Sequence, residues 1–559
     1  MKRLLISFFI CHLTISVGLA HTEKPWTFWY WMYGAVSEQG ISADLKAMKD
    51  VGLGGCYLMP IRGTAERPEY CGTAQQLSAD FWQKVDYAFL QADSLGLEMG
   101  IHICDGFALA GGPWISAEES MQKVVWTDTI VSLDRRTKTV NLPQPAKGHE
   151  GYYRDIAAFA ISVVGEAELP QPQVGGTIVR NDKGVFRSTT AGYIDYYYDR
   201  PQTVRSIKIL PNGNNVQAQR LLVQASSDGV TYNNVRQLVP PRQGWQNTDE
   251  DYTYSLPTTT ARYFRFAWTP EGTEPGSEDL DAAKWSPVLK VNDIRLSSQP
   301  VIDCYESKNG SVWRISPRAG VTYSHEEAVS IIPLQIGRHG EAILPASIAT
   351  NKDVIANRQY RIIRFGHTST GHTNATGGGA KGLECDKFSK EAVNKQIDRW
   401  FHQFMTRPHS KVVKYMHVDS WECGSQNWSK TFAEEFMRRR GYDLLPFMPV
   451  YAGVPVDHTA EAKAAGVSSD QVLRDIRQTI NDLINEVFFN TLSQRAHQYG
   501  IQLSSESVAP TMVSDGLEHF RYSDIPMGEF WLNSPTHDKP NDMLDAISGG
   551  HIYGKTLIQ

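Results

Sequence analysis

The sequence lacks an excess of positive charge. Its 559 residues contain 55 Lys and Arg against 61 Asp and Glu, which gives a formal net charge of −6. Because nucleic-acid-binding proteins carry basic clusters, this balance argues against nucleic acid as a partner. Biased tracts are also missing from a composition that is 41% hydrophobic and 21% charged, which excludes wholesale disorder and fibrous repeats. At about 150 residues per domain, the length predicts a chain of several domains.

Cysteines are few and widely spaced. After residue 20 they are Cys56, Cys71, Cys104, Cys304, Cys385 and Cys423. None of them forms a Cys-x-x-Cys pair, so neither a zinc ribbon nor a disulfide-dense scaffold fits the spacing. Cys56 and Cys104 fall in apolar, strand-like runs, and we expect both to be buried thiols.

Beyond the N-terminal segment, the sequence has no long apolar run. At the N-terminus itself, two basic residues precede an apolar stretch over residues 4–11, and the small residues Gly18 and Ala20 stand where signal cleavage requires them. This order predicts a signal peptide over residues 1–20 and export to the periplasm or the extracellular space. The stretch is shorter than the roughly 20 apolar residues that cross a bilayer, so we expect no membrane span.

Short apolar strands alternate with amphipathic helices over the first part of the mature chain. We expect strands over residues 27–32, 55–59 and 97–104, separated by helices over residues 43–51 and 81–92. Ser42 is the expected N-cap of the first helix, and Gly96 ends the second. Near-continuous apolar strands alternating with helices predict a parallel sheet that is covered on both faces.

The same alternation returns near the C-terminus. Ser389 caps a helix that ends near Pro408, and further helices are expected over residues 473–492 and 542–552. Strands are expected over residues 412–418, 501–505 and 525–531, with one more beginning at residue 555. With the three N-terminal strands, this makes six strands and the start of a seventh.

We therefore predict an incomplete (β/α)8 TIM-type barrel, C-terminally truncated, because a closed barrel needs eight strands. An open α/β sheet is the alternative architecture. No Gly-x-Gly-x-x-Gly motif follows the first strand, which argues against a dinucleotide-binding fold.

An all-β insertion is expected over residues 123–363, between the two parts of the barrel at residues 21–122 and 364–559. Over about residues 170–300 its order of strands, its Ser-Ser-Asp-Gly turn at residues 226–229 and its Ala-Arg-Tyr-Phe-Arg-Phe strand at residues 261–266 resemble galactose-binding-like β-sandwiches. A sandwich that binds no ligand remains an equal alternative for this region.

Polar and aromatic side chains gather where the predicted parallel strands end. They are His102, Asp105, His417, Asp419, Trp421, Glu422, Glu506, Glu529 and Trp531. In such barrels the working residues lie at the carboxyl ends of the strands. Paired carboxylates beside aromatic platforms suit the cleavage of glycosidic bonds, and aromatic residues make up 11% of the chain. Any one of these acids could instead serve only as an ion pair or a helix cap.

Glu422 is the strongest candidate for a catalytic acid. It follows a strand directly and precedes Cys423-Gly424, where glycine allows a close approach of the backbone. Its structural alternative is an acid that favours the start of a helix over residues 429–440. A polar, glycine-rich loop over residues 366–374 is expected above the barrel mouth and contributes His367 as a substrate-binding candidate.

Several segments taken in order resemble glycoside hydrolase family 106, the α-L-rhamnosidases. They are residues 26–31 with Gly34, 105–107, 111–114, 366–368, 382–387, 419–422 and 551–555. The resemblance covers nearly the whole chain apart from the all-β insertion. It implies an exported enzyme that removes terminal α-L-rhamnose from pectic or other plant glycans by an inverting mechanism, with two glutamates and a bound calcium ion.

Glu422 matches one of the two implied glutamates. The other belongs beyond a seventh strand that would begin after Gln559, so we expect low or no activity from residues 1–559 alone. The oxygen-rich mouth suggests Glu506, Asp105 or their neighbours as calcium ligands. The rival hypothesis from another class is an exported, non-catalytic carbohydrate-binding protein.

Overall fold

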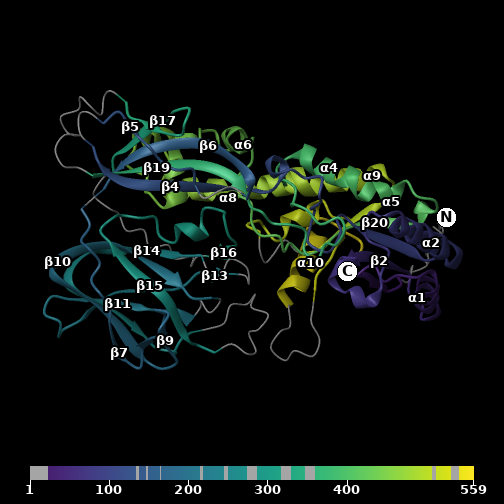
Figure 1. Cartoon of the computed structure of the whole chain (residues 1–559), viewed down its shortest axis with the longest axis horizontal. Helices are drawn as coiled ribbons and strands as arrows, with labels where there is room; N and C mark the ends of the chain where they lie inside the picture. The colour runs from purple at the N-terminus through teal and green to yellow at the C-terminus, as the bar shows by residue number, and fades with distance from the viewer. Residues whose placement is uncertain are drawn as a thin grey trace, which may run out of the picture.

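The computed structural model describes most of the mature chain (Figure 1). The described residues are 23–133, 137–145, 149–163, 165–213, 218–243, 250–273, 286–315, 329–345, 359–506, 512–529 and 540–559. The predicted signal peptide and Trp531 lie outside these ranges. Every helix within them is too short or too polar to cross a membrane.

A six-stranded parallel sheet forms a half-barrel. Its order is β1-β2-β3-β20-β21-β22, so strands from the two ends of the chain are neighbours. The strands are β1 (Trp26–Met32), β2 (Gly55–Ile61), β3 (Glu98–His102), β20 (Val413–Val418), β21 (Gln502–Ser505) and β22 (Ile525–Pro526). All six predicted strands are confirmed, although β22 stops earlier than the predicted 525–531 because Pro526 donates no backbone hydrogen bond.

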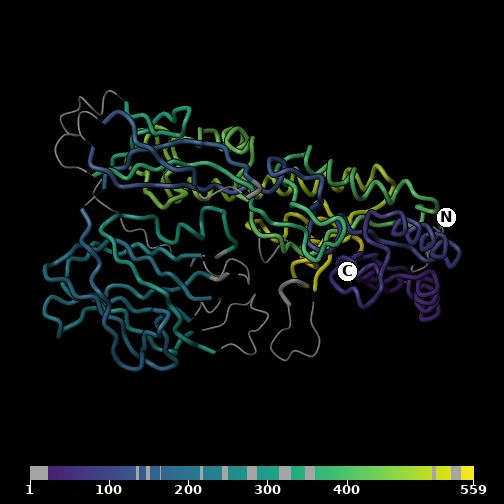
Figure 2. Tube along the Cα trace, in the orientation of Figure 1, coloured from purple at the N-terminus to yellow at the C-terminus, as the bar shows by residue number. Residues whose placement is uncertain are grey.

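The last residue continues this sheet beyond β22. The Gln559 N–H donates to the Pro526 carbonyl and the Gly528 N–H donates to the Gln559 carbonyl, each at 2.9 Å. This is parallel pairing at the place of the predicted seventh strand, although residues 555–559 do not form a regular strand. Across the sheet, the Tyr57 hydroxyl donates to Gln559 Oε1 at 2.9 Å. Figure 2 accordingly shows the C-terminus beside the N-terminal segments. Closure into an eight-stranded barrel stays a prediction.

The helices of the described residues are α1 (Glu38–Asp50), α2 (Ala79–Leu95), α4 (Lys390–Arg399), α5 (Phe401–Met405), α6 (Phe432–Arg440), α7 (Ala460–Ala465), α8 (Ser469–Leu483), α9 (Asn490–Gln498) and α10 (Pro540–Ile552). Among them, α2, α9 and α10 contact strands of the half-barrel. A π-helical turn over Ile484–Phe489 joins α8 to α9, which together form the long helix that the sequence predicts.

The helix boundaries test the predicted caps. Ser389 caps α4 by accepting from the Ala392 N–H, and Gly96 ends α2 in the left-handed region, as predicted. The expected cap at Ser42 is wrong, because α1 begins earlier and Ser37 accepts from the Gly40 N–H. Ser42 lies inside the helix, where its hydroxyl bonds the Tyr87 hydroxyl at 2.8 Å.

The two faces of the half-barrel carry different cores. Toward the helices, apolar residues such as Leu58 and Met99 belong to the main hydrophobic core. The inner face is lined with aromatic rings, and Tyr57 and Tyr415 are buried there against Trp26 and Phe28. The inner face therefore presents aromatic surface toward the carboxyl edge of the sheet.

The long insertion between β3 and β20 forms two larger antiparallel sheets, at one end of the molecule in Figure 1. The first contains β4 (Gln122–Ser132), β5 (Thr139–Val140), β6 (His149–Ser162), β17 (Ile331–Ile336), β18 (Ala342–Ile343) and β19 (Gln359–Ser369). The second contains β7 (Gln173–Gly176), β8 (Val179–Arg180), β9 (Phe186–Ser188), β10 (Gly192–Pro211), β11 (Leu222–Ser226), β12 (Asn233–Gln237), β14 (Tyr252–Trp268) and β15 (Leu289–Ser297). A short pair joins β13 (Arg242–Gln243) to β16 (Arg314–Ile315).

The second antiparallel sheet has a core of its own, which includes Tyr196, Phe264 and Trp268. Within residues 123–363, the described part contains strands β4 to β19 and a short 3-10 helix at Tyr305–Ser307, and the assignment of this region as one all-β insertion stays a prediction. The galactose-binding-like assignment of residues 170–300 stays a prediction.

Candidate active site

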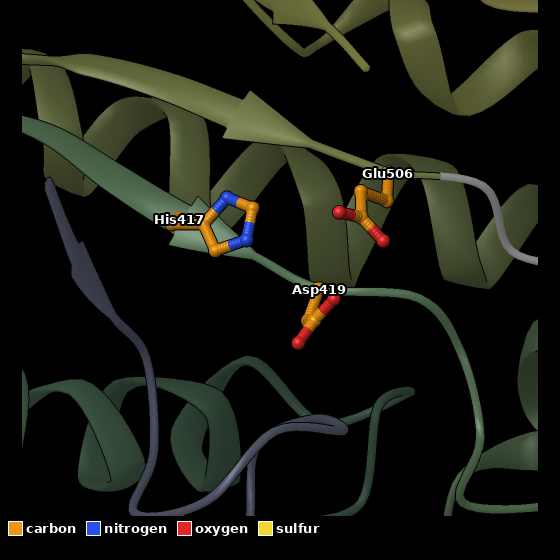
Figure 3. Close-up of side chains that lie close together, drawn as sticks. All are labelled: His417, Asp419 and Glu506. Atoms are coloured by element: carbon orange, nitrogen blue, oxygen red, sulfur yellow. The ribbon is translucent and has the colours of Figure 1, made fainter. Parts of the chain in front are cut away.

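Three polar side chains meet at the carboxyl ends of β20 and β21. The ligand atoms of His417, Asp419 and Glu506 all lie within 4.8 Å of one another. Figure 3 shows them gathered around one space at the ends of the two neighbouring strands. The parallel register, which pairs Val418 with Ser505, explains why residues far apart in sequence end at the same level. We call these three residues the acid cluster.

One carboxyl group of the acid cluster, that of Glu506, has a strongly raised pKa. Burial, followed by the charge of Asp419, raises the pKa of Glu506 well above its ordinary value. The two carboxyl groups also share a hydrogen bond, which favours one proton between them. The raised pKa favours the protonated form of Glu506, in which the carboxyl can donate a hydrogen bond to an acceptor such as Asp419.

Two buried polar atoms of the acid cluster have no partner among the described residues. They are His417 Nε2 and Glu506 Oε2. His417 Nδ1 lies 3.1 Å from the Ser504 hydroxyl, and burial lowers the pKa of His417 to about 3, so the ring is neutral. An unsatisfied buried polar atom costs about 1–3 kcal/mol. These two atoms are therefore available to a bound water or ligand.

Tyr30 is a site residue that the sequence reasoning missed. It lies on the inner face of β1, where its ring stacks on Phe28, and the Phe28 ring lies 5.6 Å from His417. Burial, and then the charges of Asp419, Glu506 and Glu529, raise the pKa of its hydroxyl. Strand periodicity could have found it, because Phe28 and Tyr30 alternate with the outward-facing Trp29 and Trp31.

Glu529 and Glu422 flank the acid cluster. Glu529 is half-buried, and its charge helps to raise the pKa of Glu506. Glu422 is also half-buried, and its Oε1 accepts from the Ser420 hydroxyl at 3.3 Å. The Ser420 N–H donates to Asp419 Oδ1 at 3.0 Å, so the loop that carries Glu422 is tied to the acid cluster.

Gly424 fixes the path of the Glu422 loop. Its φ of +77° lies in the left-handed region, and a Cβ atom there would lie 2.6 Å from His372 Nε2. The predicted close approach of the backbone at this glycine is therefore present, with the His372 ring as the neighbour.

His102 and Asp105 hold loops in place. His102 is buried, and its Nε2 accepts from the Asp419 N–H at 3.3 Å while Nδ1 donates to the Cys104 carbonyl at 3.2 Å. Asp105 is buried, and its Oδ2 accepts from the Gly378 and Ala380 N–H groups at 2.8 Å each. Their contacts orient backbone at the sheet edge, whereas the sequence analysis expected them to contact substrate.

Two further candidates have a different environment from the one predicted. Trp421 was expected to offer its ring to a sugar, but it is 1% exposed and packs on Phe488, with its Nε1 donating to the Gly424 carbonyl. His367 was expected in a loop over the mouth, but it lies in β19, buried beside Trp428 and bonded to Gln122. The loop prediction for residues 366–369 is wrong because β19 extends to Ser369 between two partner strands.

A buried ion pair lies next to Trp421, and the sequence did not predict it. Lys387 Nζ lies 2.8 Å from Glu384 Oε2, and both side chains are fully buried. Glu384 also accepts from the Leu109 and Ala110 N–H groups, at 3.1 and 2.9 Å. Lys387 Nζ lies 5.7 Å from the Trp421 ring, so the pair connects three loops, one of which carries Glu422.

Carboxyl groups at the carboxyl edge of a parallel half-barrel, next to aromatic side chains, have the arrangement of barrel-type glycosidases. The sequence model of glycoside hydrolase family 106, described as alpha-L-rhamnosidase, matches residues 20–559. The chain therefore belongs to the α-L-rhamnosidase family.

Two relatives extend this comparison. The chain is 24% identical over 540 residues to a Formosa agariphila protein named "Putative beta-glucuronidase", a match that covers 96% of this chain and 33% of that protein. A solved rhamnosidase structure from Novosphingobium sp. PP1Y has the same fold, with a TM-score of 0.69 and 24% identity over 96% of this chain. The chain spans 51% of the length of that structure.

Proposed function

We propose that the protein is an exported glycosidase that removes terminal α-L-rhamnose from pectic or other plant glycans. The observation that carries this proposal is the convergence of Asp419, Glu506 and Glu529 around unpaired buried atoms, in a chain of the α-L-rhamnosidase family. Burying several carboxyl groups without a ligand is costly, whereas sugar hydroxyls supply donors and acceptors for all of them.

Each group has a definite task in this proposal. In the absence of a cation, Glu506 donates to a sugar hydroxyl, Asp419 accepts from one, and Tyr30 closes the space from β1. Glu422 is one of the two carboxylates of an inverting mechanism, in which the pair stands roughly 6.5–9.5 Å apart to admit water. The second glutamate that the family resemblance implies has no match in residues 1–559.

We also propose calcium as the cation of this site. Asp419 and Glu506 offer the carboxylate oxygens that calcium prefers, and Glu506 Oε2 is unpaired. His417 fits calcium less well, because imidazole nitrogen is a softer ligand, so its Nε2 is assigned to a sugar hydroxyl. When bound, calcium would displace the proton of Glu506, would be held by both groups as carboxylates and would attract sugar oxygens. Calorimetry should show calcium binding that Asp419→Asn abolishes; an unchanged heat in the variant would contradict the assignment.

Ligand binding tests the function without requiring turnover. We expect the 559-residue chain to bind L-rhamnose in titration calorimetry, and Asp419→Asn to weaken that binding at least tenfold, the effect of losing a charged hydrogen bond. Preference for D-glucuronate over L-rhamnose would instead favour the activity named for the Formosa relative. Binding of neither sugar would refute the proposal.

A hydrolysis assay distinguishes a glycosidase from a non-catalytic carbohydrate-binding protein. The assay measures release of the aryl group from an aryl α-L-rhamnoside by the 559-residue chain and by its Glu422→Gln variant. A rate that Glu422→Gln abolishes would establish catalysis, and NMR would then show β-L-rhamnose as the first product of an inverting enzyme. Rhamnose binding without any effect of Asp419→Asn would favour the non-catalytic carbohydrate-binding protein.

A further inference from the structure

A second group of exposed side chains lies on the same edge of the half-barrel as the acid cluster. Tyr33 follows β1, and Arg67 and Tyr70 lie in the segment after β2. β1 and β2 run parallel in register and end together at Met32 and Ile61. Because β20 and β21 run in the same direction, all these residues lie at the carboxyl ends of the strands. We call Tyr33, Arg67 and Tyr70 the tyrosine platform.

The tyrosine platform is compact, and its Arg67 and Tyr70 side chains are exposed while Tyr33 is half-buried. The Tyr33 and Tyr70 ring centroids are 5.4 Å apart, and the Arg67 guanidinium lies 6.0 and 5.6 Å from them. Tyr70 is 51% exposed. The Arg67 guanidinium also lies 3.3 Å from the Glu69 carboxylate, and both of those side chains are at least half exposed. Aromatic faces, hydrogen-bond donors and an acceptor are thus grouped within one exposed patch.

The backbone beneath the tyrosine platform is firmly held. The Tyr33 N–H donates to the Ile61 carbonyl at 3.1 Å, and the Thr73 and Ala74 N–H groups both donate to the Gly34 carbonyl at 3.1 Å. Tyr33 itself has a φ of +57°, in the left-handed region that residues with a side chain seldom occupy. Such strained positions concentrate at functional sites, where the surrounding structure maintains them.

Tyr30 connects the tyrosine platform to the acid cluster. Tyr30 stands within electrostatic reach of Asp419, Glu506 and Glu529, and Tyr33 follows three residues later on the same chain segment. Three extended residues span about 10 Å, which is longer than a single pyranose ring. A ligand that reaches from the acid cluster to the tyrosine platform must therefore be a chain of sugars.

We infer that the tyrosine platform is a distal glycan subsite, which binds a pyranose residue on the leaving-group side of a terminal rhamnose. This inference rests on the proposed function, which places rhamnose at the acid cluster. The tyrosine rings pack against the C–H faces of the sugar, while Arg67 and Glu69 exchange their mutual contact for its hydroxyls. That exchange costs little because exposed ion pairs contribute little to stability. The preferred substrate is accordingly an oligosaccharide and not a small aryl rhamnoside.

The second antiparallel sheet offers a matched control. Tyr197 and Tyr263 stack at 4.8 Å, and the Arg262 guanidinium lies 5.2 and 5.7 Å from their rings. Tyr197 is 37% exposed. Tyr197→Ala therefore removes a tyrosine from a similar Tyr-Tyr-Arg group that lies outside the half-barrel.

The test measures two affinities of each variant. One is for a tetrasaccharide that carries terminal α-L-rhamnose on three β-linked galactose residues, and the other is for L-rhamnose alone. Glu422→Gln in the full 559-residue chain keeps the ligand intact during calorimetry. We expect the ratio of the two affinities to fall about tenfold in Tyr70→Ala and in Tyr33→Gly, the effect of one stacking partner, and to stay the same in Tyr197→Ala. Tyr33→Gly also relieves the left-handed strain, so its loss of affinity cannot be ascribed to unfolding.

The outcomes separate this inference from the proposed function. If L-rhamnose binds but the ratio is the same in all variants, the distal subsite is refuted and the proposed function stands. If L-rhamnose does not bind while tetrasaccharide binding still depends on Tyr70, the proposed function fails and the subsite is supported. If only Tyr197→Ala lowers the ratio, the glycan chain binds the antiparallel sheet, and the subsite is refuted.

Discussion

Replacing Lys387 with methionine should strongly destabilise the protein, because it leaves a buried charge without its partner. Lys387 and Glu384 are both fully buried at 2.8 Å, and Met preserves most of the apolar stem that lies against Trp421 and Phe488. Glu384 would keep only the Leu109 and Ala110 N–H groups. Removing one member of a buried ion pair costs about 3–5 kcal/mol.

A matched pair on the surface supplies the control. Lys395 lies 2.8 Å from Glu119, the same separation, but these side chains are 35% and 37% exposed. Lys395→Met should therefore cost no more than about 1 kcal/mol. Urea unfolding followed by circular dichroism measures both variants. Adding Glu384→Gln to Lys387→Met should restore part of the stability, because it removes the unpaired charge. Equal losses of unfolding free energy in Lys387→Met and Lys395→Met would contradict the expected effect of burial.

Three further predictions concern buried acids and the Glu422 loop. Burial raises the pKa of Asp105 to about 7, so its contribution to stability falls as pH rises from about 4 to 7, and Asp105→Asn should flatten the pH dependence of urea unfolding. The raised pKa of Glu506 has the same sign, so Glu506→Gln should be more stable than the parent chain above pH 7 without calcium; equal thermal midpoints would contradict this. Gly424→Ala should cost about 1–2 kcal/mol and weaken L-rhamnose binding, and unchanged calorimetry would show that the loop tolerates the side chain.

The strands of the half-barrel could be predicted because apolar runs and glycine stops are local signals. Six strands and the caps at Ser389 and Gly96 are where the sequence places them. The predicted N-cap of α1, Ser42, lies inside the helix, and the true N-cap is Ser37. Both residues are serines, and only the folded structure shows that the Ser42 hydroxyl bonds Tyr87. Local patterns thus locate an element better than they locate its first residue.

The sequence predicted that the site residues lie at the carboxyl ends of the strands. It did not predict which of their side chains point into the site and which point into the core. His417, Asp419 and Glu506 meet as expected because parallel strands bring their carboxyl ends to one edge. Trp421 follows the same strand as Asp419 yet turns into the core, where Phe488 covers its ring.

The Lys387–Glu384 pair depends on contacts between loops that are distant in sequence. Glu384 is bonded to Leu109 and Ala110, more than 270 positions earlier, which no short pattern reveals. The same limit applies to the tyrosine platform, whose Tyr33 and Tyr70 come from loops after different strands.

We propose above all that carboxyl groups from separate strands of the half-barrel surround one sugar. A crystal structure of the chain soaked with L-rhamnose would show whether they do. We expect a bound sugar in hydrogen-bond contact with Asp419 and Glu506 and beside Tyr30. A sugar bound on the outer face of β10 and β14, with none at the acid cluster, would contradict it.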